Sequence, residues 1–489
     1  MRQLTVEHVV IGAGTAGLAA YRTIAASGQS VLLIEGGEHG TTCARVGCMP
    51  SKLLIAAAEA AHGVSRWGPL GLRLEGALQV DGAAVMARVQ RERDRFVGFV
   101  LEGVERIPPQ HRLTGYARFL APGLLQVEEH TQVRFTTAVI ATGSSPQIPG
   151  FLLPFRERVV INDDIFAWTQ LPRSVAVFGT GVIGLELGQA LQRLGVQVHL
   201  FGRGGRIGPL TDPALQAEAQ RCLGAELQLI HDPQGLQLSS QGPRVRIEWH
   251  NPGAAQGAHE GTPRRKAIEV EWILAATGRR PNLAHLGLDT LGLELDAQGV
   301  PQFQRTTLQC GAHPIFIAGD ANQDLPLLHE AADEGRIAGE NALRYPHVAP
   351  GLRRSALAIV FSDPQMVTVG ERWQECSQQS IVTGKVSFAD QGRSRVMLRN
   401  QGLLHVYAAR EDGRLLGAEM IGPEAEHLGH LLAWAHQLQL TIPQMLELPF
   451  YHPVVAEGLR TALRDAASQL PLRRAPAPQG RHPVAALSV

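Results

Sequence analysis

Short, continuously apolar runs recur along the chain and predict buried strands. "VVI" at 9–11 and "SVLLIE" at 30–35 are the first two, and the stretch between them continues as a helix from Ala19 to Ala26. The same strand, glycine turn, helix and strand follow at 174–203. Strands that are apolar throughout are typical of parallel sheets covered on both faces. The alternation of strands and helices therefore predicts an α/β fold.

The turn after the first strand has the glycine spacing of a dinucleotide site. Its three glycines are Gly12, Gly14 and Gly17. Such glycines let backbone N–H groups approach a pyrophosphate at a helix N-terminus. The second strand ends in Glu35, an acid placed to accept hydrogen bonds from a ribose. Motif and context together predict a bound dinucleotide.

A second copy of this motif lies near the middle of the chain, with Gly179, Gly181 and Gly184. The acid expected at the end of its second strand is missing, because Gly202 stands there, followed by Arg203 and, further on, Arg206. An acid at this position suits NAD, whereas arginines accommodate the 2′-phosphate of NADP. The arginines could equally be solvated loop residues, so the choice between NAD and NADP stays open.

Three further strand ends support two nucleotide sites. "TTAVIATG" ends at Thr142-Gly143 and "EWILAATG" ends at Gly278, and both resemble crossings between two nucleotide domains. "HPIFIAGD" ends at Gly319-Asp320, where a carboxylate at a strand's C-terminal end can hold a cofactor hydroxyl. A flavin that stays bound and a nicotinamide that exchanges form the natural pair for moving a hydride.

Composition and charge narrow the class of protein. The 489 residues suggest about three domains. Lys plus Arg and Asp plus Glu are both 45, so no net charge favours nucleic acid or an acidic surface. No apolar run reaches the roughly 20 residues of a membrane helix, and the N-terminus does not resemble a secretory signal. We therefore expect a cytoplasmic protein without nucleic-acid or membrane partners.

Two of the five cysteines, Cys43 and Cys48, lie close together in "GTTCARVGCMPSK". In a reducing compartment such a pair is more often catalytic or metal-binding than structural. A zinc site needs a second ligand pair, and Cys222, Cys310 and Cys376 are scattered singly. A redox pair is therefore favoured over a disulfide staple or a metal site, and no metal is expected.

With the cysteine pair, the two glycine motifs and Gly319-Asp320 in this order, the chain resembles the FAD-dependent pyridine nucleotide–disulfide oxidoreductases over roughly residues 5–465. "CARVGCMPSK" is similar to the family's CxxxxC active-site motif. Within the family, the dihydrolipoyl dehydrogenase branch is the most similar. The mercuric reductase branch is disfavoured, because the C-terminus lacks its cysteine pair. Gly202-Arg203 departs from the lipoyl branch and is closer to the glutathione reductase branch.

The resemblance implies that Cys48 lies against the flavin and that Cys43 exchanges sulfur with the substrate. A disulfide needs Cα atoms within about 7 Å, whereas five extended residues span over 16 Å at about 3.3 Å each. A bond between the two cysteines therefore requires a coiled, distorted segment at a helix start, which Gly47 eases. The helix dipole, with Arg45 or a histidinium, can stabilise a thiolate there.

Two further constellations follow from the same resemblance. Lys52 lies one turn after Cys48, and the family pattern pairs it with Glu186 beside the flavin and nicotinamide rings; the alternative is an ordinary ion pair. In "PFYHPVVAEGLRTALRD", His452 would exchange the substrate proton and Glu457 would fix its tautomer. Pro453 suggests the first helical position, with His452 at the cap. The resemblance implies that this dyad reaches the cysteines of a second subunit in a homodimer.

The predicted architecture is an α/β chain with two Rossmann-like dinucleotide-binding domains, for FAD and NAD(P), and a C-terminal α+β dimerisation domain. The expected segments are an FAD-binding domain, an NAD(P)-binding domain, a segment completing the FAD site, an interface domain and a disordered tail, at 1–150, 151–278, 279–350, 351–470 and 471–489. The polar stretch 251–266 is expected to be a hairpin loop.

The expected function is oxidation of dihydrolipoamide by NAD+ through FAD and a redox-active disulfide. The expected partner is a lipoyl-domain protein or a small disulfide substrate. The alternative is an NADPH-dependent disulfide reductase of the glutathione-reductase type. A non-enzymatic flavoprotein subunit is a third class, and the complete set of Cys43, Cys48, His452 and Glu457 argues against it.

Overall fold

The structure is a computed structural model, and it describes residues 1–251 and 265–471. The predicted hairpin loop at 251–266 and the predicted tail at 471–489 lie almost wholly outside the described residues. None of the helices in the described part is long and apolar enough to cross a membrane.

The chain forms two compact units. The first contains residues 1–209, 219–354 and 360–363, and the second contains 210–218, 355–359 and the chain from 364 onward. The second unit thus includes a short stretch, 210–218, that precedes most of it in sequence by well over a hundred residues. The five-segment division expected from the sequence stays a prediction.

The N-terminal part of the first unit is built on a five-stranded parallel sheet. Its strands, in spatial order, are β19 (Ile315–Ile317), β8 (Thr137–Ile140), β2 (His8–Ile11), β3 (Val31–Glu35) and β4 (Arg112–Thr114). The predicted apolar runs at 9–11 and 30–35 form its centre. The predicted helix is α1 (Thr15–Ala25), which starts four residues earlier than expected.

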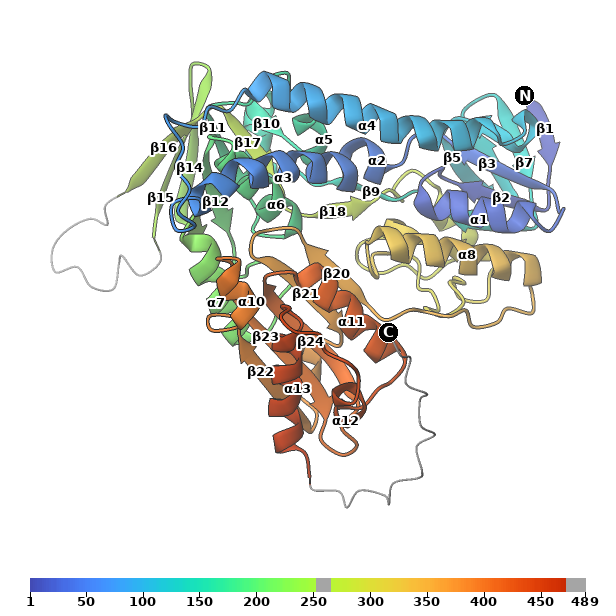
Figure 1. The fold of residues 1–489 in the computed structure, drawn as a ribbon. Helices are drawn as coiled ribbons and strands as arrows, with labels where there is room; N and C mark the ends of the chain where they lie inside the picture. The colour runs from blue at the N-terminus through green and yellow to red at the C-terminus, as the bar shows by residue number, and fades with distance from the viewer. Residues whose placement is uncertain (252–264, 472–489) are drawn as a thin grey trace. The chain divides into compact units, whose positions relative to one another are not determined.

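Alternate residues of the central strands enter two different cores. Val10 and Leu33 pack with α1 and α8 (Leu328–Arg344), which lie side by side in Figure 1. Val9 and Ile34 pack against a four-stranded sheet on the other face. That sheet has the order β1 (Arg2–Thr5), β7 (Thr131–Arg134), β6 (Leu124–Val127) and β5 (Ala117–Ala121). Coverage of both faces explains why these strands are continuously apolar.

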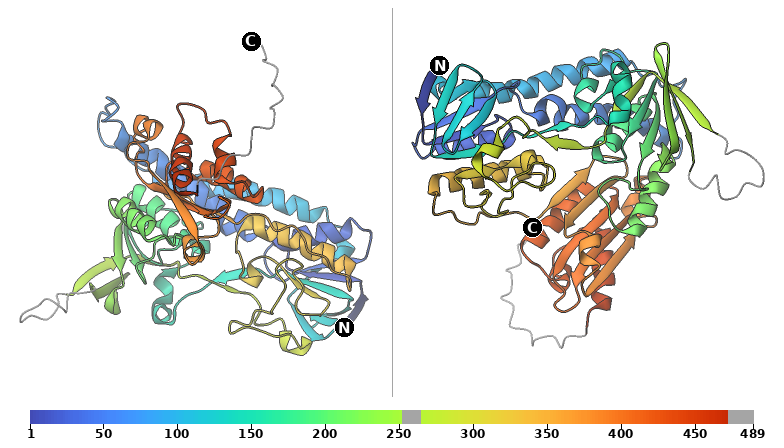
Figure 2. Two further views of the ribbon diagram at one scale, coloured as in Figure 1. Left: turned by 90° about the horizontal axis from the view of Figure 1, so that it is seen from below. Right: turned by 180° about the vertical axis from the view of Figure 1, so that it is seen from behind.

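A second five-stranded parallel sheet repeats the pattern. Its order is β10 (Val159–Val160), β17 (Trp272–Ala275), β11 (Ser174–Phe178), β12 (Gln197–Gly202) and β13 (Gln228–His231). Helix α6 (Val182–Arg193) follows the second glycine motif, and α7 (Pro213–Gly224) connects β12 to β13. An antiparallel ribbon of β14 (Gln234–Gln241), β15 (Arg244–His250) and β16 (Lys266–Val270) packs on this sheet through an apolar cluster that includes Trp249 (Figure 2).

The two predicted crossings pair with each other. β9 (Ser144–Pro146) follows the first Ala-Thr-Gly, β18 (Arg279–Pro281) follows the second, and the two form an antiparallel ladder. The remaining helices of this unit are α2 (Thr42–Val46), α3 (Cys48–Gly63), α4 (Gly82–Glu105) and α5 (Asn162–Ile165).

The second unit is an antiparallel sheet covered by helices. The strand order is β20 (Leu357–Val360), β21 (Gln365–Gly370), β24 (Leu415–Gly422), β23 (Leu403–Ala409) and β22 (Ile381–Ser387). α11 (Ala425–Gln437) and α13 (Glu457–Gln469) pack on one face around a single apolar core. The short helices are α9 (Trp373–Cys376), α10 (Gly392–Val396) and α12 (Ile442–Leu446). The predicted α/β class with a C-terminal α+β part is confirmed.

Candidate active site and cofactor sites

The three glycines of the first motif have different steric roles in the turn between β2 and α1. A Cβ on Gly12 would lie 2.3 Å from the Ala141 carbonyl oxygen, and Gly12 has a φ of +106°. A Cβ on Gly17 would lie 1.8 Å from the Gly12 carbonyl oxygen, so this glycine lets the helix approach the strand. A Cβ on Gly14 would meet no described atom within 4 Å, which leaves room for a ligand at the helix N-terminus.

Glu35 at the end of β3 organises this turn. Its carboxylate accepts hydrogen bonds from the backbone N–H of Ala13, at 2.6 Å, and of Gly37, at 2.7 Å. Each carboxylate oxygen has a further lone pair for a hydroxyl donor. Glu35 therefore lies where the sequence predicts a ribose contact.

A cavity of about 850 Å³ opens between the glycine turn, Glu35 and the first crossing. That volume suits a large organic ligand. The lining includes Thr142 and Gly143, and the Thr142 hydroxyl is buried without a hydrogen-bond partner among the described residues. At the end of β19, one Asp320 oxygen accepts a hydrogen bond from the hydroxyl of Ser144, another lining residue, at 2.8 Å. Polar groups at the ends of β3 and β8 thus line the cavity, and Asp320 contacts this lining through Ser144 without being one of the described lining residues itself.

The second glycine motif repeats the geometry of the first. A Cβ on Gly179 would lie 2.2 Å from the Ala276 carbonyl oxygen, and one on Gly184 would lie 2.0 Å from the Gly179 carbonyl oxygen. Gly181 again has open space around it. Gly278, with a φ of +107°, accepts a hydrogen bond from the Gln147 N–H at 2.9 Å and connects this site to the crossing.

Strand register shows that Gly202 occupies the position of Glu35. The Gly12 N–H donates to the Ile34 carbonyl oxygen in the first sheet, and the Gly179 N–H donates to the Phe201 carbonyl oxygen in the second. The residues that follow these acceptors, Glu35 and Gly202, therefore occupy equivalent positions. A side chain larger than glycine would meet Thr180 there, because a Cβ would lie 2.9 Å from its side-chain atoms. Arg203 follows directly and is exposed.

Lys52 and Glu186 form the predicted pair. The Lys52 ammonium lies 2.8 Å from one Glu186 oxygen, and the other accepts the backbone N–H of Phe361 at 2.9 Å. The same ammonium lies 4.4 Å from the centroid of the Phe361 ring. Glu186 is only 5% exposed and Lys52 is 33% exposed, so the carboxylate is well shielded while the ammonium remains partly open to solvent. Phe361 has no motif of its own and could not be predicted from the sequence.

The two cysteines lie on either side of a helix break. Cys43 is in α2, Cys48 is the first residue of α3, and Gly47 between them has non-helical torsion angles (φ −123°, ψ −117°). The segment is therefore coiled and distorted, as a bond between the two cysteines would require. Both residues are free thiols in this structure, so it contains the dithiol form of the expected redox pair.

The two thiols differ in acidity. A hydrogen bond from Cys43 is the main cause that lowers the pKa of Cys48 to about 7, and the charge of Lys52 assists. The same hydrogen bond and burial raise the pKa of Cys43. The predicted help from Arg45 is not what lowers the pKa of Cys48, because the Arg45 guanidinium forms an ion pair with Glu38. Cys48 is thus the thiolate and Cys43 the thiol.

The third constellation, His452 and Glu457, lies in the second unit. His452 Nδ1 is 3.0 and 3.1 Å from the two Glu457 oxygens, and the hydrogen bond with His452 lowers the pKa of Glu457. The expectation that Pro453 opens the helix is wrong, since α13 begins at Glu457. Glu457 instead lies at the positive end of the helix and accepts the Val454 N–H at 3.2 Å. His452 Nε2 is then the ring nitrogen that can exchange a proton.

Profiles of known families match almost the whole described chain. The pyridine nucleotide-disulphide oxidoreductase family matches residues 6–335, and the dimerisation domain of the same family matches residues 357–463. The chain belongs to this family. As a pyridine nucleotide–disulphide oxidoreductase it uses FAD and NAD(P), and its dimerisation domain supports a homodimer.

Curated relatives of this oxidoreductase extend over nearly the full length. Dihydrolipoyl dehydrogenase 3 of Pseudomonas aeruginosa is 29% identical over 478 residues, covering 94% of this chain and 97% of the relative. Dihydrolipoyl dehydrogenase of Thermus scotoductus is 30% identical over 474 residues, covering 94% and 96%. The chain is therefore a flavin-dependent disulfide oxidoreductase similar to dihydrolipoyl dehydrogenases.

Solved structures show the same fold. LpdA from Mycobacterium tuberculosis superposes with a TM-score of 0.78 at 22% identity, covering 94% of this chain and 99% of the other. The HOCl-induced flavoprotein disulfide reductase RclA from Escherichia coli superposes with a TM-score of 0.76 at 20% identity, with the same coverage.

The residues of the first cavity fit FAD. The open space at Gly14 suits a pyrophosphate, Glu35 suits a ribose, and the buried Thr142 hydroxyl needs a polar partner that the described chain does not supply. The lining also includes Thr41, Thr42 and Val46 from the cysteine segment, so the cavity runs up to the α2–α3 break. Within the described chain, Cys43, Cys48 and Lys52 are not among its lining residues.

Proposed function

We propose that this oxidoreductase oxidises dihydrolipoamide, carried by a lipoyl-domain protein, through the Cys43–Cys48 pair and passes the electrons to a nicotinamide nucleotide. The names of the relatives supply the substrate class. The observation that supports the chemistry best is the unequal pair at the head of α3, with Cys48 near pKa 7 and Cys43 above its ordinary value.

In the first exchange a dihydrolipoamide thiolate attacks the Cys43 sulfur of the oxidised pair. A mixed disulfide forms, the Cys43–Cys48 bond breaks, and Cys48 leaves as a thiolate. A leaving thiol of low pKa departs faster, so the lowered pKa of Cys48 favours attack at Cys43. The second substrate sulfur then attacks the first, which closes lipoamide and releases Cys43.

His452 removes a proton from each attacking substrate thiol and returns one to Cys43. Glu457 holds the ring through Nδ1 and stabilises the imidazolium. In the proposed homodimer this dyad serves the cysteines of the other subunit. FAD held in the first cavity would supply the two-electron chemistry that links the dithiol to the nicotinamide. The Lys52 cation, fixed by Glu186, favours negative charge in that region.

Steady-state assays test the substrate. We expect dihydrolipoamide to be turned over far faster than glutathione or a small protein dithiol, each followed by nicotinamide reduction. Cys43→Ser should abolish this turnover, whereas exchange of Cys310, buried in the core, for alanine should leave it intact. Inertness of dihydrolipoamide with both NAD+ and NADP+ would contradict the proposal.

A second candidate function is reduction of a disulfide by NADPH, and Gly202 favours it. A Cβ at the Glu35-equivalent position would lie 2.9 Å from the Thr180 side chain, which disfavours an acid there, and Arg203 follows with an exposed charge that suits a 2′-phosphate. Comparing kcat/KM for NADH and NADPH with one disulfide distinguishes the candidates. Arg203→Leu should weaken the binding of NADPH selectively if the arginine binds the phosphate, and should affect the binding of both nucleotides equally if it does not.

A cytoplasmic location remains part of this proposal, since both candidates need a reducing compartment.

A further inference from the structure

A buried carboxylate fixes the turn that presents Asp320. Glu334 on α8 is fully buried, and one of its oxygens accepts the Gly319 N–H at 2.7 Å and the Asn322 side-chain amide at 2.8 Å. These two residues are the ends of the Gly319–Asn322 turn, so a single oxygen holds both sides of Asp320. The conformation of that turn therefore depends on the state of Glu334.

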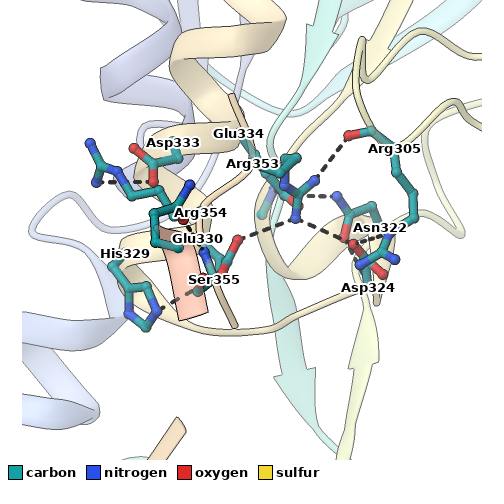
Figure 3. Close-up of polar contacts among 12 residues, drawn as sticks. Arg305, Asn322, Asp324, His329, Glu330, Asp333, Glu334, Arg353, Arg354 and Ser355 are labelled. Atoms are coloured by element: carbon teal, nitrogen blue, oxygen red, sulfur yellow. Dashed lines mark hydrogen bonds and ion pairs between the residues drawn. The ribbon is translucent and has the colours of Figure 1, made fainter. Parts of the chain in front are cut away.

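Arg353 supplies the positive charge that Glu334 needs. Its Nη2 atom lies 2.9 Å from the second Glu334 oxygen, 3.2 Å from Glu330 and 3.3 Å from Asp324, and Figure 3 shows the guanidinium among them. Nη1 donates to the Arg305 carbonyl oxygen at 3.1 Å, which fixes the orientation of the guanidinium group. Burial raises the pKa of Glu334, and Arg353 opposes that effect. A fully buried carboxylate without such a partner is strongly disfavoured.

Arg353 also belongs to the segment through which the chain leaves the first unit. It lies in the segment that leaves α8, and the chain enters the second unit again at Ser355. The neighbouring Arg354 is different, because it is 62% exposed and pairs with Asp333 at 3.1 Å, away from the turn. The exit segment of the first unit is thus tied to the turn through Arg353 and Glu334.

We infer that Arg353 is a positioning residue for FAD, which acts through Glu334 to hold the Gly319–Asn322 turn and so aims Asp320 at the cofactor. The inference rests on the proposed assignment of Asp320 to FAD, and it concerns cofactor retention rather than the disulfide substrate. The same contacts couple FAD binding to the order of the segment that contains Arg353, because energetic coupling between two sites acts in both directions.

The test measures FAD release from the diluted holoenzyme by the rise of flavin fluorescence, without any disulfide substrate. Arg353→Met should speed the release or raise the FAD dissociation constant by about tenfold or more. Arg353→Lys should restore most of the retention, because it returns the charge. Arg354→Met, the matched neighbour, should retain FAD like the original protein. Equal retention in Arg353→Met and Arg354→Met would overturn the inference.

A double-variant cycle separates positioning through Glu334 from a general structural effect. Because both residues act on one turn, Arg353→Met combined with Glu334→Gln should lose FAD no faster than Arg353→Met alone. Losses that multiply would show independent roles and overturn the inference. If Arg353→Met fails to fold by circular dichroism, Arg353→Gln, which also removes the charge, replaces it in the cycle with the same expectations. Lipoamide turnover, assayed separately, judges the proposed function whichever way FAD release turns out.

Discussion

At the scale of single residues, the reactivity of a side chain depends on the groups that stabilise its charged form. Cys43 and Cys48 are both thiols near one helix start, yet one donates to the other, and Lys52 favours the charge on Cys48. His452 is likewise one of 19 histidines, and it combines a carboxylate on Nδ1 with an exposed ring, whereas His405, which has Asp212 on its Nδ1, is buried. Neighbours, rather than residue type, decide these roles.

The cysteine assignment predicts how the reduced protein reacts with iodoacetamide. The rate at Cys48 should rise with pH around 7, as the thiolate forms. Cys43→Ala removes the hydrogen-bond donor, so the pKa of Cys48 should move towards its ordinary value and the rate at pH 7 should fall roughly tenfold. Cys43→Ser keeps a hydroxyl donor and should show a smaller loss. Mass spectrometry of the modified peptide provides the rates, and an unchanged profile in Cys43→Ala would contradict the assignment.

The dyad predicts a graded loss of turnover. His452→Gln should lower kcat with dihydrolipoamide by roughly 10²–10⁴-fold, because the proton acceptor is lost. Glu457→Gln should lower it less, since the ring remains but is held more weakly. His347→Gln, at an exposed histidine in the first unit, should have no effect. Normal turnover in His452→Gln would exclude it as the base.

At the scale of elements, helix α8 must approach α1 very closely for the first site to form. A Cβ on Gly335 would lie 2.1 Å from the Ala16 carbonyl oxygen, and a Cβ on Gly339 would lie 2.9 Å from the Ala20 carbonyl oxygen. The contact brings Glu334 next to Gly319. Small residues on α8 therefore determine the cofactor turn from a distance.

This packing predicts a large difference between two glycine-to-alanine exchanges. Gly335→Ala should lower the free energy of unfolding by about 3 kcal/mol, because the added methyl group meets backbone. Gly98→Ala in α4, where the new Cβ would have no described atom within 4 Å, should be neutral or stabilise by up to about 1 kcal/mol. Urea denaturation of both variants measures the difference, and equal stabilities would show that α8 can move away from α1.

At the scale of the whole molecule, one helix face of the dimerisation domain is apolar and exposed. Leu431, Trp434 and Leu438 share a face of α11 and its C-terminal end, and Trp434 is 63% exposed. The opposite face of α11 is buried in the core of the second unit. Exposed apolar patches of this kind mark interaction surfaces, and a second copy is the partner that the domain supports.

We therefore predict that Trp434→Glu converts the dimer to a monomer in sedimentation experiments, because a charge would be buried in the contact. Turnover of dihydrolipoamide should fall with dimerisation if His452 serves the partner subunit. Leu153→Glu, at an exposed apolar residue of the first unit, should remain dimeric. A dimeric Trp434→Glu protein would place the contact elsewhere.

The sequence by itself determined those features that depend on local backbone and burial. Glycine turns, all-apolar strands and the helix break at Gly47 are encoded by neighbouring residues, so the α/β fold and both nucleotide motifs could be predicted. Contacts between distant residues could not be derived this way: Lys52 and Glu186 were paired only through the family resemblance, and Arg353 and Glu334 were not predicted. In the sequence, the acids of α8 resemble a solvated helix face. Only tertiary packing buries Glu334, selects Lys52 over Arg45 as the cation beside Cys48, and starts α13 at Glu457, because charge and capping depend on neighbours that the fold brings together.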